Sequence, residues 1–348
     1  MKKGNVAALL PIGVFLVLYL GLGILFEYGM GISMGFYNIP IVVIFLVALL
    51  VACFQNRSLS FDDKLVVMGR GIGDKTIVTM ILIFMAAGVF VGTVGRDSAE
   101  SVAYLMLSVI PAEYSVAVLF VVSCFVSLSM GTSVGTITLI TPIAVAVAAA
   151  SGVSLPLCVA SVMGGAMFGD NLSFISDTTI AATRTQGVAL KDKFRVNFYI
   201  ALPAALITLV ILLLIGRGST AVMEPRAFEL VKVLPYVLVL VLAIVGINVF
   251  LTLTIGIFTA GIIGIVYGDL TIFTFAQAIW NGFTGMSEVF FLALFCGGIS
   301  ELIAHNGGIV WLIEKLRKRM HGGRSAQVGI AALVSLADFA TANNTVAI

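Results

Sequence analysis

The chain has 348 residues, of which 60% are hydrophobic and only 10% are charged, and its mean hydropathy is +1.17. Soluble globular domains are about 45–50% apolar and about 25% charged, so this composition excludes a soluble enzyme domain. The continuous apolar runs also exclude a transmembrane β-barrel, whose strands alternate between apolar and polar residues. A membrane-spanning helix needs roughly 20 apolar residues, which leaves room for about ten crossings.

The first apolar run extends from Val6 to about Phe26. It is longer than the hydrophobic core of a secretory signal, so we predict that it is the first membrane span. A second predicted span ends near Cys53. The cysteines lie in apolar stretches without metal-site or disulfide spacing, and we expect buried thiols at Cys53, Cys124, Cys158 and Cys296.

Basic residues predict the orientation of the chain in the membrane. Of the 19 Lys and Arg residues, 15 fall at Lys2 and Lys3 and within residues 57–75, 184–195 and 315–324. Cytoplasmic loops are enriched in Lys and Arg, so we predict that these segments and the N-terminus are cytoplasmic. The net charge of +2 gives no indication of a nucleic-acid partner.

About 70 nearly apolar residues separate the predicted outer loop at 96–113 from the basic segment at 184. This stretch must cross the membrane an odd number of times. One broken span with a re-entrant hairpin and three separate spans both satisfy this condition. We expect breaks at Gly131, Gly135, Pro142, Gly152 and Gly169.

The chain resembles itself at an offset near 210 residues. Residues 72–95 align with residues 282–305, and residues 126–136 parallel residues 334–345, which brings Thr132 onto Thr341 and Thr136 onto Thr345. The basic loop at 57–75 is predicted inside, whereas its counterpart at 269–285 has no Lys or Arg and is predicted outside. Aligned segments with opposite orientation indicate an inverted repeat, as in many secondary transporters.

We therefore predict an all-α polytopic membrane protein with two inverted-topology repeats and broken helices or re-entrant hairpins at the midplane. The first membrane repeat covers residues 1–217. The second covers residues 218–348 and is expected to be truncated at its C-terminus, because its counterpart in the first repeat continues for about 80 residues.

Five carboxylates lie in apolar or small-polar surroundings, at Asp170, Asp177, Glu288, Glu301 and Asp338. A charged side chain costs about 2.5–3.5 kcal/mol at the centre of a membrane helix, so such residues mark ion or proton pathways. We expect no Lys or Arg at that depth, which favours a cation site.

The densest polar cluster falls within residues 168–179. Its candidate ligands are Asp170, Asn171, Ser173, Ser176, Asp177, Thr178 and Thr179. On an unbroken helix Asp170 and Asp177 would be about 10.5 Å apart, too far to hold one ion together. An unwound segment would let carbonyls, hydroxyls and one carboxylate converge. A polar seam between packed helices is the alternative.

Two further clusters offer side-chain oxygens among small residues. They contribute Thr132, Ser133 and Thr136, and Asp338, Thr341, Asn343, Asn344 and Thr345. Residues 131–135 match the G-x-S-x-G pattern, but no strand precedes them and the apolar region offers no His partner. We expect no enzyme activity and no cofactor.

The segment GTSVGTITLITPIA, followed by FGDNLSFISDTT, resembles the signature region of the NhaC-type sodium/proton antiporters. The segment ADFATANNTVAI is similar to the second-repeat element of that family. The resemblance implies an ion-transporter fold in a bacterial cytoplasmic membrane, with the three clusters forming the ion pathway. The family pattern usually has Pro where this chain has Phe174, which leaves the position of the helix break open.

The predicted function is exchange of cytoplasmic Na⁺ for external H⁺, with Asp177 or Asp170 binding either the cation or the proton. The alternative is Na⁺- or H⁺-coupled transport of a small organic anion such as malate or lactate. The expected absence of a buried Lys or Arg argues against that alternative. The expected partners are the lipid bilayer, Na⁺ and H⁺, and a homodimer is left open.

Overall fold

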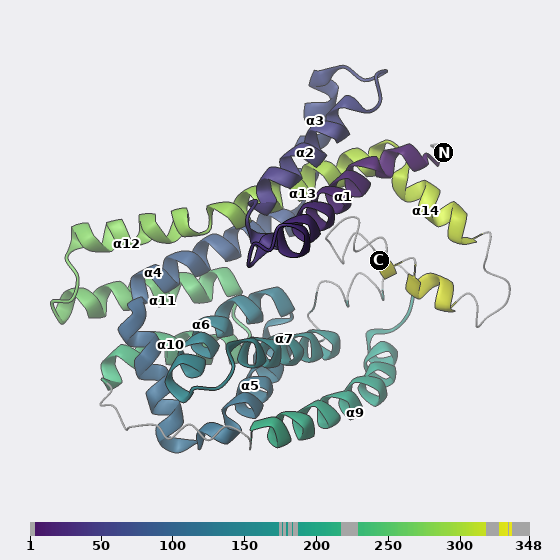
Figure 1. Ribbon diagram of the computed structural model, residues 1–348. Helices are drawn as coiled ribbons and strands as arrows, with labels where there is room; N and C mark the ends of the chain where they lie inside the picture. The colour runs from purple at the N-terminus through teal and green to yellow at the C-terminus, as the bar shows by residue number, and fades with distance from the viewer. Residues whose placement is uncertain are drawn as a thin grey trace. The chain divides into compact units, whose positions relative to one another are not determined.

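The computed structural model describes residues 4–173, 176, 179, 183, 187–216, 229–317, 327–332 and 334–335 (Figure 1). Within these residues the chain is all-helical, which confirms the predicted helical class. The chain divides into two compact units. The first unit contains Met1–Ile81 and Ser287–Ile348, and the second contains Leu82–Met286.

The first unit holds the two ends of the chain. Its described helices are η1 (Val6–Leu9), α1 (Leu10–Ile24), η2 (Leu25–Gly29), η3 (Gly35–Tyr37), α2 (Ile41–Phe54), α3 (Phe61–Ile72), α13 (Ser287–His305) and α14 (Gly308–Arg317). Apolar residues of α2, α3 and α13 form its core, with Ala52, Val67 and Leu302 almost fully buried. The backbones of α3 and α13 touch at Gly71 and Gly297, where a side chain on either residue would meet the other helix.

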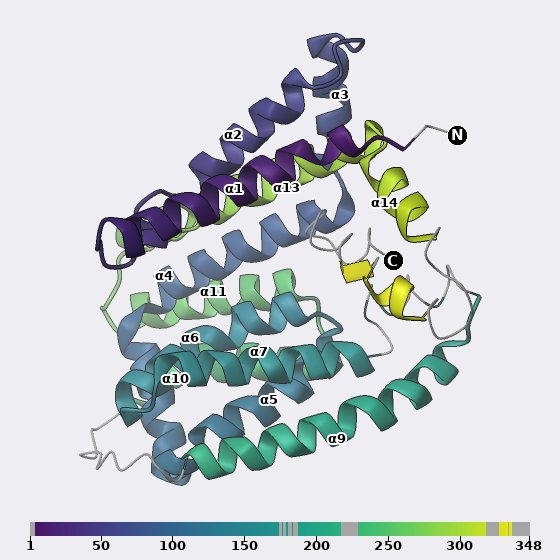
Figure 2. The ribbon, with the colours of Figure 1, turned by 45° about the vertical axis from the view of Figure 1, so that its right-hand side comes forward.

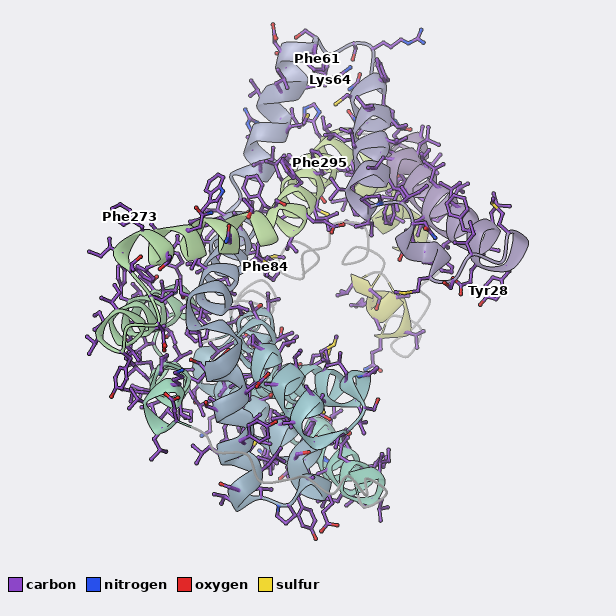
Figure 3. The ribbon with its side chains drawn as sticks, turned by 60° about the vertical axis from the view of Figure 1, so that its left-hand side comes forward. Tyr28, Phe61, Lys64, Phe84, Phe273 and Phe295 are labelled. Atoms are coloured by element: carbon purple, nitrogen blue, oxygen red, sulfur yellow. The ribbon has the colours of Figure 1, made fainter. Side chains whose placement is uncertain are left out.

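Two polar contacts hold the ends of helices in the first unit. Lys64 is 8% exposed, and its ammonium donates over 2.8 Å to the carbonyl of Cys53 in the last turn of α2. Figure 3 shows Lys64 and Phe61 on α3. The amide of Asn56 donates to the Asn306 side-chain oxygen over 2.9 Å. A cation beside helix-end carbonyls is favourable because those carbonyls have no partner within the helix.

The second unit contains the central part of the chain. Its described helices are α4 (Lys75–Val109, which starts in the first unit), η4 (Ala112–Tyr114), α5 (Ser115–Met130), α6 (Ser133–Ser151), α7 (Leu155–Leu172), α9 (Leu190–Gly216), α10 (Leu230–Ile244), α11 (Val249–Val266) and α12 (Ile272–Gly285). Figure 2 shows α5, α6 and α7 packed side by side. Their core includes Phe90, whose ring meets that of Tyr236 edge-on at 5.1 Å.

Within the described residues, eight helices are long and apolar enough to cross a membrane. The predicted first span is confirmed as a helical segment over Val6–Gly29. The helix predicted to end near Cys53 is α2, which has only 14 residues. At 1.5 Å per residue, α2 is roughly 21 Å long, shorter than the ~30 Å apolar core of a bilayer.

Residues 114–172, which lie in the segment that one broken span or three spans could cross, form α5, α6 and α7. Each is long enough to span when α5 is taken with η4. Their turns contain Gly131 and Gly152 at φ +68° and +69°, so the breaks predicted there are confirmed. The breaks predicted at Gly135, Pro142 and Gly169 are wrong, because these residues lie inside helices. Gly135 and Gly169 instead let neighbouring helices approach closely.

Two other expectations concern the cysteines and the repeat boundary. The four cysteines are free thiols, but only Cys158 is fully buried, and the others are partly buried. The two compact units follow the packing of helices and do not test the repeat boundary between residues 217 and 218, which stays a prediction.

Candidate ion-binding site

The end of α7 is positioned by close packing against α5. A side chain added at Gly165 would meet the carbonyl of Phe120, and one added at Gly169 would meet the backbone of Cys124 and Leu128. The hydroxyl of Ser127 donates to the Ala166 carbonyl over 2.5 Å. Because later residues of α7 meet later residues of α5, the two helices are parallel, and both end on the same side of the bundle.

Helix α7 ends inside the densest predicted cluster. Its last residue is Leu172, and Ser173 is extended at φ −72° and ψ 134°. The helix therefore ends before Phe174, which fixes the position of the break that the sequence left undetermined. Ser173, Ser176 and Thr179 are at most 4% exposed. An interrupted helix leaves backbone carbonyls of its last turn without helical partners, which is how broken membrane helices bind cations.

Lys193 reaches this helix end from the start of α9. Its ammonium donates to the backbone carbonyl of Asn171 over 2.5 Å and to the hydroxyl of Thr179 over 2.7 Å. It also interacts electrostatically with Asp170. The sequence predicts no Lys or Arg at the depth of the carboxylates and does not indicate that Lys193 contacts this cluster. The flexible stem of a lysine can carry the charge well away from the backbone that bears it, which a position in the sequence does not reveal.

Asp170 and Asn171 contribute different atoms to the site. The Oδ1 atom of Asp170 is buried and accepts no hydrogen bond from the described residues. The side-chain amide of Asn171 donates over 3.1 Å to Met167 of its own helix, so only the backbone carbonyl of Asn171 meets Lys193. A buried oxygen without a donor is costly unless a ligand or proton satisfies it.

The cluster at Thr132, Ser133 and Thr136 forms the turn from α5 into α6. Thr132 caps α6 by accepting from the amide of Gly135 over 3.3 Å. The fully buried Thr136 hydroxyl donates to the Thr132 carbonyl over 2.9 Å. Because α5 and α7 are parallel, this turn lies at the same end of the bundle as the end of α7. The structure thus brings two predicted clusters to one end of the second unit.

Several predicted site residues are outside the part of the chain that the structure describes. These are Asp177, Thr178, Asp338, Thr341, Asn343, Asn344 and Thr345. Among the other predicted membrane carboxylates, Glu288 is exposed at the start of α13, and Glu301 is half-buried later in the same helix.

The sequence interpretation missed a cavity in the second unit. Gly95 interrupts α4 at φ +74° and ψ 173°, a conformation that essentially only glycine adopts. Beside it is a cavity of about 350 Å³ between α4, α10 and α11. Lys232 lines this cavity and pairs with Asp269 at 3.3 Å. A signal was present, since Lys232 is a charged residue in the first turn of an otherwise apolar helix.

Several curated proteins are similar to the chain in sequence. It is 25% identical over 324 residues to a malate-2H⁺/Na⁺-lactate antiporter of Bacillus subtilis, covering 88% of this chain and 65% of the relative. It is 27% identical over 263 residues to the Na⁺/H⁺ antiporter NhaC of Alkalihalophilus pseudofirmus, covering 71% of this chain and 56% of the relative. It is 29% identical over 148 residues to an uncharacterized Na⁺/H⁺ antiporter of Haemophilus influenzae, covering 42% of this chain and 32% of the relative.

The chain thus spans between about a third and two thirds of the length of these relatives. The model of the Na⁺/H⁺ antiporter family matches residues 6–217, which include α1 to α7, α9 and the two clusters at the end of the bundle. The chain therefore belongs to the Na⁺/H⁺ antiporter family, a family of membrane transporters and not of enzymes, as its NhaC-type motifs indicate.

Proposed function

We propose that the protein exchanges cytoplasmic Na⁺ for external H⁺ by alternating access, as a multi-pass protein of a bacterial cytoplasmic membrane with a cytoplasmic N-terminus. The observation that carries this proposal is the end of α7. There a backbone carbonyl and a hydroxyl bind one cationic group, the Lys193 ammonium, and the charge of the Asp170 carboxylate attracts it. Oxygen ligands of these three kinds are the ones that hard cations prefer.

Competition at one carboxylate couples the two ions in this mechanism. Burial favours the protonated form of a carboxylate and a bound cation favours its ionised form, so each ligand displaces the other. Asp177 is the first candidate for this carboxylate, and Asp170 is the second. In support of Asp170, its Oδ1 atom is buried and accepts no hydrogen bond from described residues. The exchange needs no cofactor.

Alternating access would come from two inverted repeats, residues 1–217 and 218–348. Two pairs of helices support this division. Helix α3 has 12 residues and is capped by Ser60, and α12 has 14 residues and is capped by Thr271. Each is followed by a long apolar helix, over Lys75–Gly95 and over Ser287–His305.

The close contacts of these helices follow the same offset. In the first unit, Gly71 at the end of α3 touches Gly297 on α13. In the second unit, Gly282 near the end of α12 touches Gly88 on α4. The residue pairs correspond within one or two positions at an offset near 210, as two related repeats would require.

Transport of a small organic anion with Na⁺ or H⁺ is the second candidate function. The contact of Lys193 with the site favours this function, because a basic group can bind an organic anion. The expected absence of such a group was the argument against it. One relative is named as a malate-2H⁺/Na⁺-lactate antiporter. Uptake of labelled malate or lactate into proteoliposomes, compared with Na⁺ uptake alone, separates the two functions.

Sodium-dependent dissipation of a proton gradient tests the main proposal. In vesicles that contain the protein, addition of Na⁺ should collapse an imposed pH gradient, and choline should not. We expect Asp177→Asn or Asp170→Asn to abolish this response, because an amide cannot exchange a proton for a cation. Asp192→Asn is the control, since Asp192 is exposed at the start of α9. Full activity in both site variants would exclude both carboxylates.

A further inference from the structure

Two oxygens of the candidate site meet at the Lys193 ammonium. It donates to the Asn171 carbonyl and to the Thr179 hydroxyl, and the charge of the Asp170 carboxylate attracts it. These groups come from the last turn of α7 and from Thr179, seven residues beyond its end. An ammonium and a sodium ion are both compact monovalent cations that bind such oxygens.

A second lysine of the chain shows what helix capping alone looks like. Lys64 donates to the Cys53 carbonyl at the end of α2, just as Lys193 donates to the Asn171 carbonyl at the end of α7. Lys193 differs in having a side-chain hydroxyl as its second acceptor and Asp170 as an attracting charge. It is also less buried than Lys64, because α9 begins among exposed residues such as Lys191 and Asp192.

We propose that the Lys193 ammonium occupies the position of the transported cation in the sodium-free protein and that Na⁺ displaces it on binding. This inference rests on the proposed exchange of Na⁺ at the end of α7. The tethered charge would compensate Asp170 while no ion is bound, which lowers the cost of an unpaired carboxylate in apolar surroundings. Two cations cannot share these oxygens, so Na⁺ binding must move the ammonium towards the exposed start of α9.

The first test is the affinity of the purified protein for ²²Na⁺. If the Lys193 ammonium leaves the site open for about a tenth of the time, Na⁺ binds about tenfold more weakly than it would to a permanently open site. We therefore expect Lys193→Gln to lower the Kd for Na⁺ by about tenfold, with slower exchange in vesicles. Lys193→Arg keeps the charge, so its Kd should stay within about threefold of the wild type.

Two matched variants separate displacement from general effects of charge and capping. Lys191→Gln removes the same charge two residues away at an exposed position and should leave the Kd unchanged. Lys64→Gln removes a capping ammonium in the other unit and should lower thermal stability without tightening Na⁺ binding. A Kd for Lys193→Gln equal to or higher than that of the wild type would overturn the proposal.

The second test uses the wild-type protein and does not depend on the folding of any variant. Amine-reactive labelling followed by mass spectrometry should modify Lys193 faster in Na⁺ than in choline, with Lys191 labelled equally in both. A rate at Lys193 that Na⁺ leaves unchanged or lowers contradicts displacement. A wild-type protein that binds no ²²Na⁺ refutes the proposed function itself, which keeps the two failures apart.

Discussion

Asp170 owes its position to the residue before it. Gly169 has no side chain, so α7 can approach α5 until its backbone touches Cys124 and Leu128. The next residue, Asp170, is therefore held near the level of Leu128 on α5. Gly164 lies on the same helix but has more room, since an added side chain would be 3.6 Å from the Phe120 ring.

We expect Gly169→Ala to destabilise the protein by about 1–3 kcal/mol, because an extra methyl group must push two backbones apart. Gly164→Ala, with ordinary van der Waals distances around the new methyl group, should change stability by less than about 0.5 kcal/mol. Thermal unfolding in detergent measures both changes. Equal midpoints for the two variants would contradict the packing role of Gly169.

At the scale of elements, α4 shows how one residue divides a helix. The helix runs over Lys75–Val109, and Gly95 is the point at which its φ and ψ leave the helical region. The part before the break is apolar and 21 residues long, whereas the part after it is shorter. The break also borders the cavity that Lys232 lines.

We expect Gly95→Ala to cost about 1–3 kcal/mol of stability, because an alanine at φ +74° is strained. Gly21→Ala is the control, since Gly21 lies in α1 with open space around it and should gain up to about 1 kcal/mol from better helix propensity. Chemical or thermal unfolding of both variants measures the difference. A Gly95→Ala protein as stable as the Gly21→Ala protein would argue against strain at this break.

For the whole molecule, the proposed inverted repeat makes a prediction about two exposed phenylalanines. Phe61 begins α3 and is 61% exposed, and Phe273 lies at the start of α12 and is 86% exposed. Figure 3 labels both residues. They correspond at an offset of about 210, but the positive-inside rule predicts that Phe61 is inside and Phe273 is outside.

We expect Phe61→Cys to react with a membrane-impermeant maleimide only from the cytoplasmic side and Phe273→Cys only from the outer side. Both variants are made in a background that lacks the four native cysteines. Right-side-out and inverted vesicles give the two sides, and the cysteine-free parent measures background labelling. Reaction of both variants from one side would refute opposite orientation of the repeats.

The sequence alone determined the class of the protein and its family, and it predicts oxygen ligands for a cation. Hydropathy along the chain predicts membrane helices because each helix must bury about 20 successive apolar residues in lipid. The motif around Asp170 identifies the polar segment that interrupts them. These properties depend on residues that are neighbours in the sequence.

Only the tertiary structure decided which distant groups meet. Lys193 contacts a carbonyl 22 residues and a hydroxyl 14 residues before it. Gly169 was expected to break a helix, but it instead packs one helix on another. Local composition cannot distinguish a glycine that bends the backbone from one that lets a neighbouring helix approach. It also cannot distinguish a lysine that stays in a loop from one whose ammonium contacts a site. Both distinctions depend on the path that the backbone takes between residues distant in the sequence.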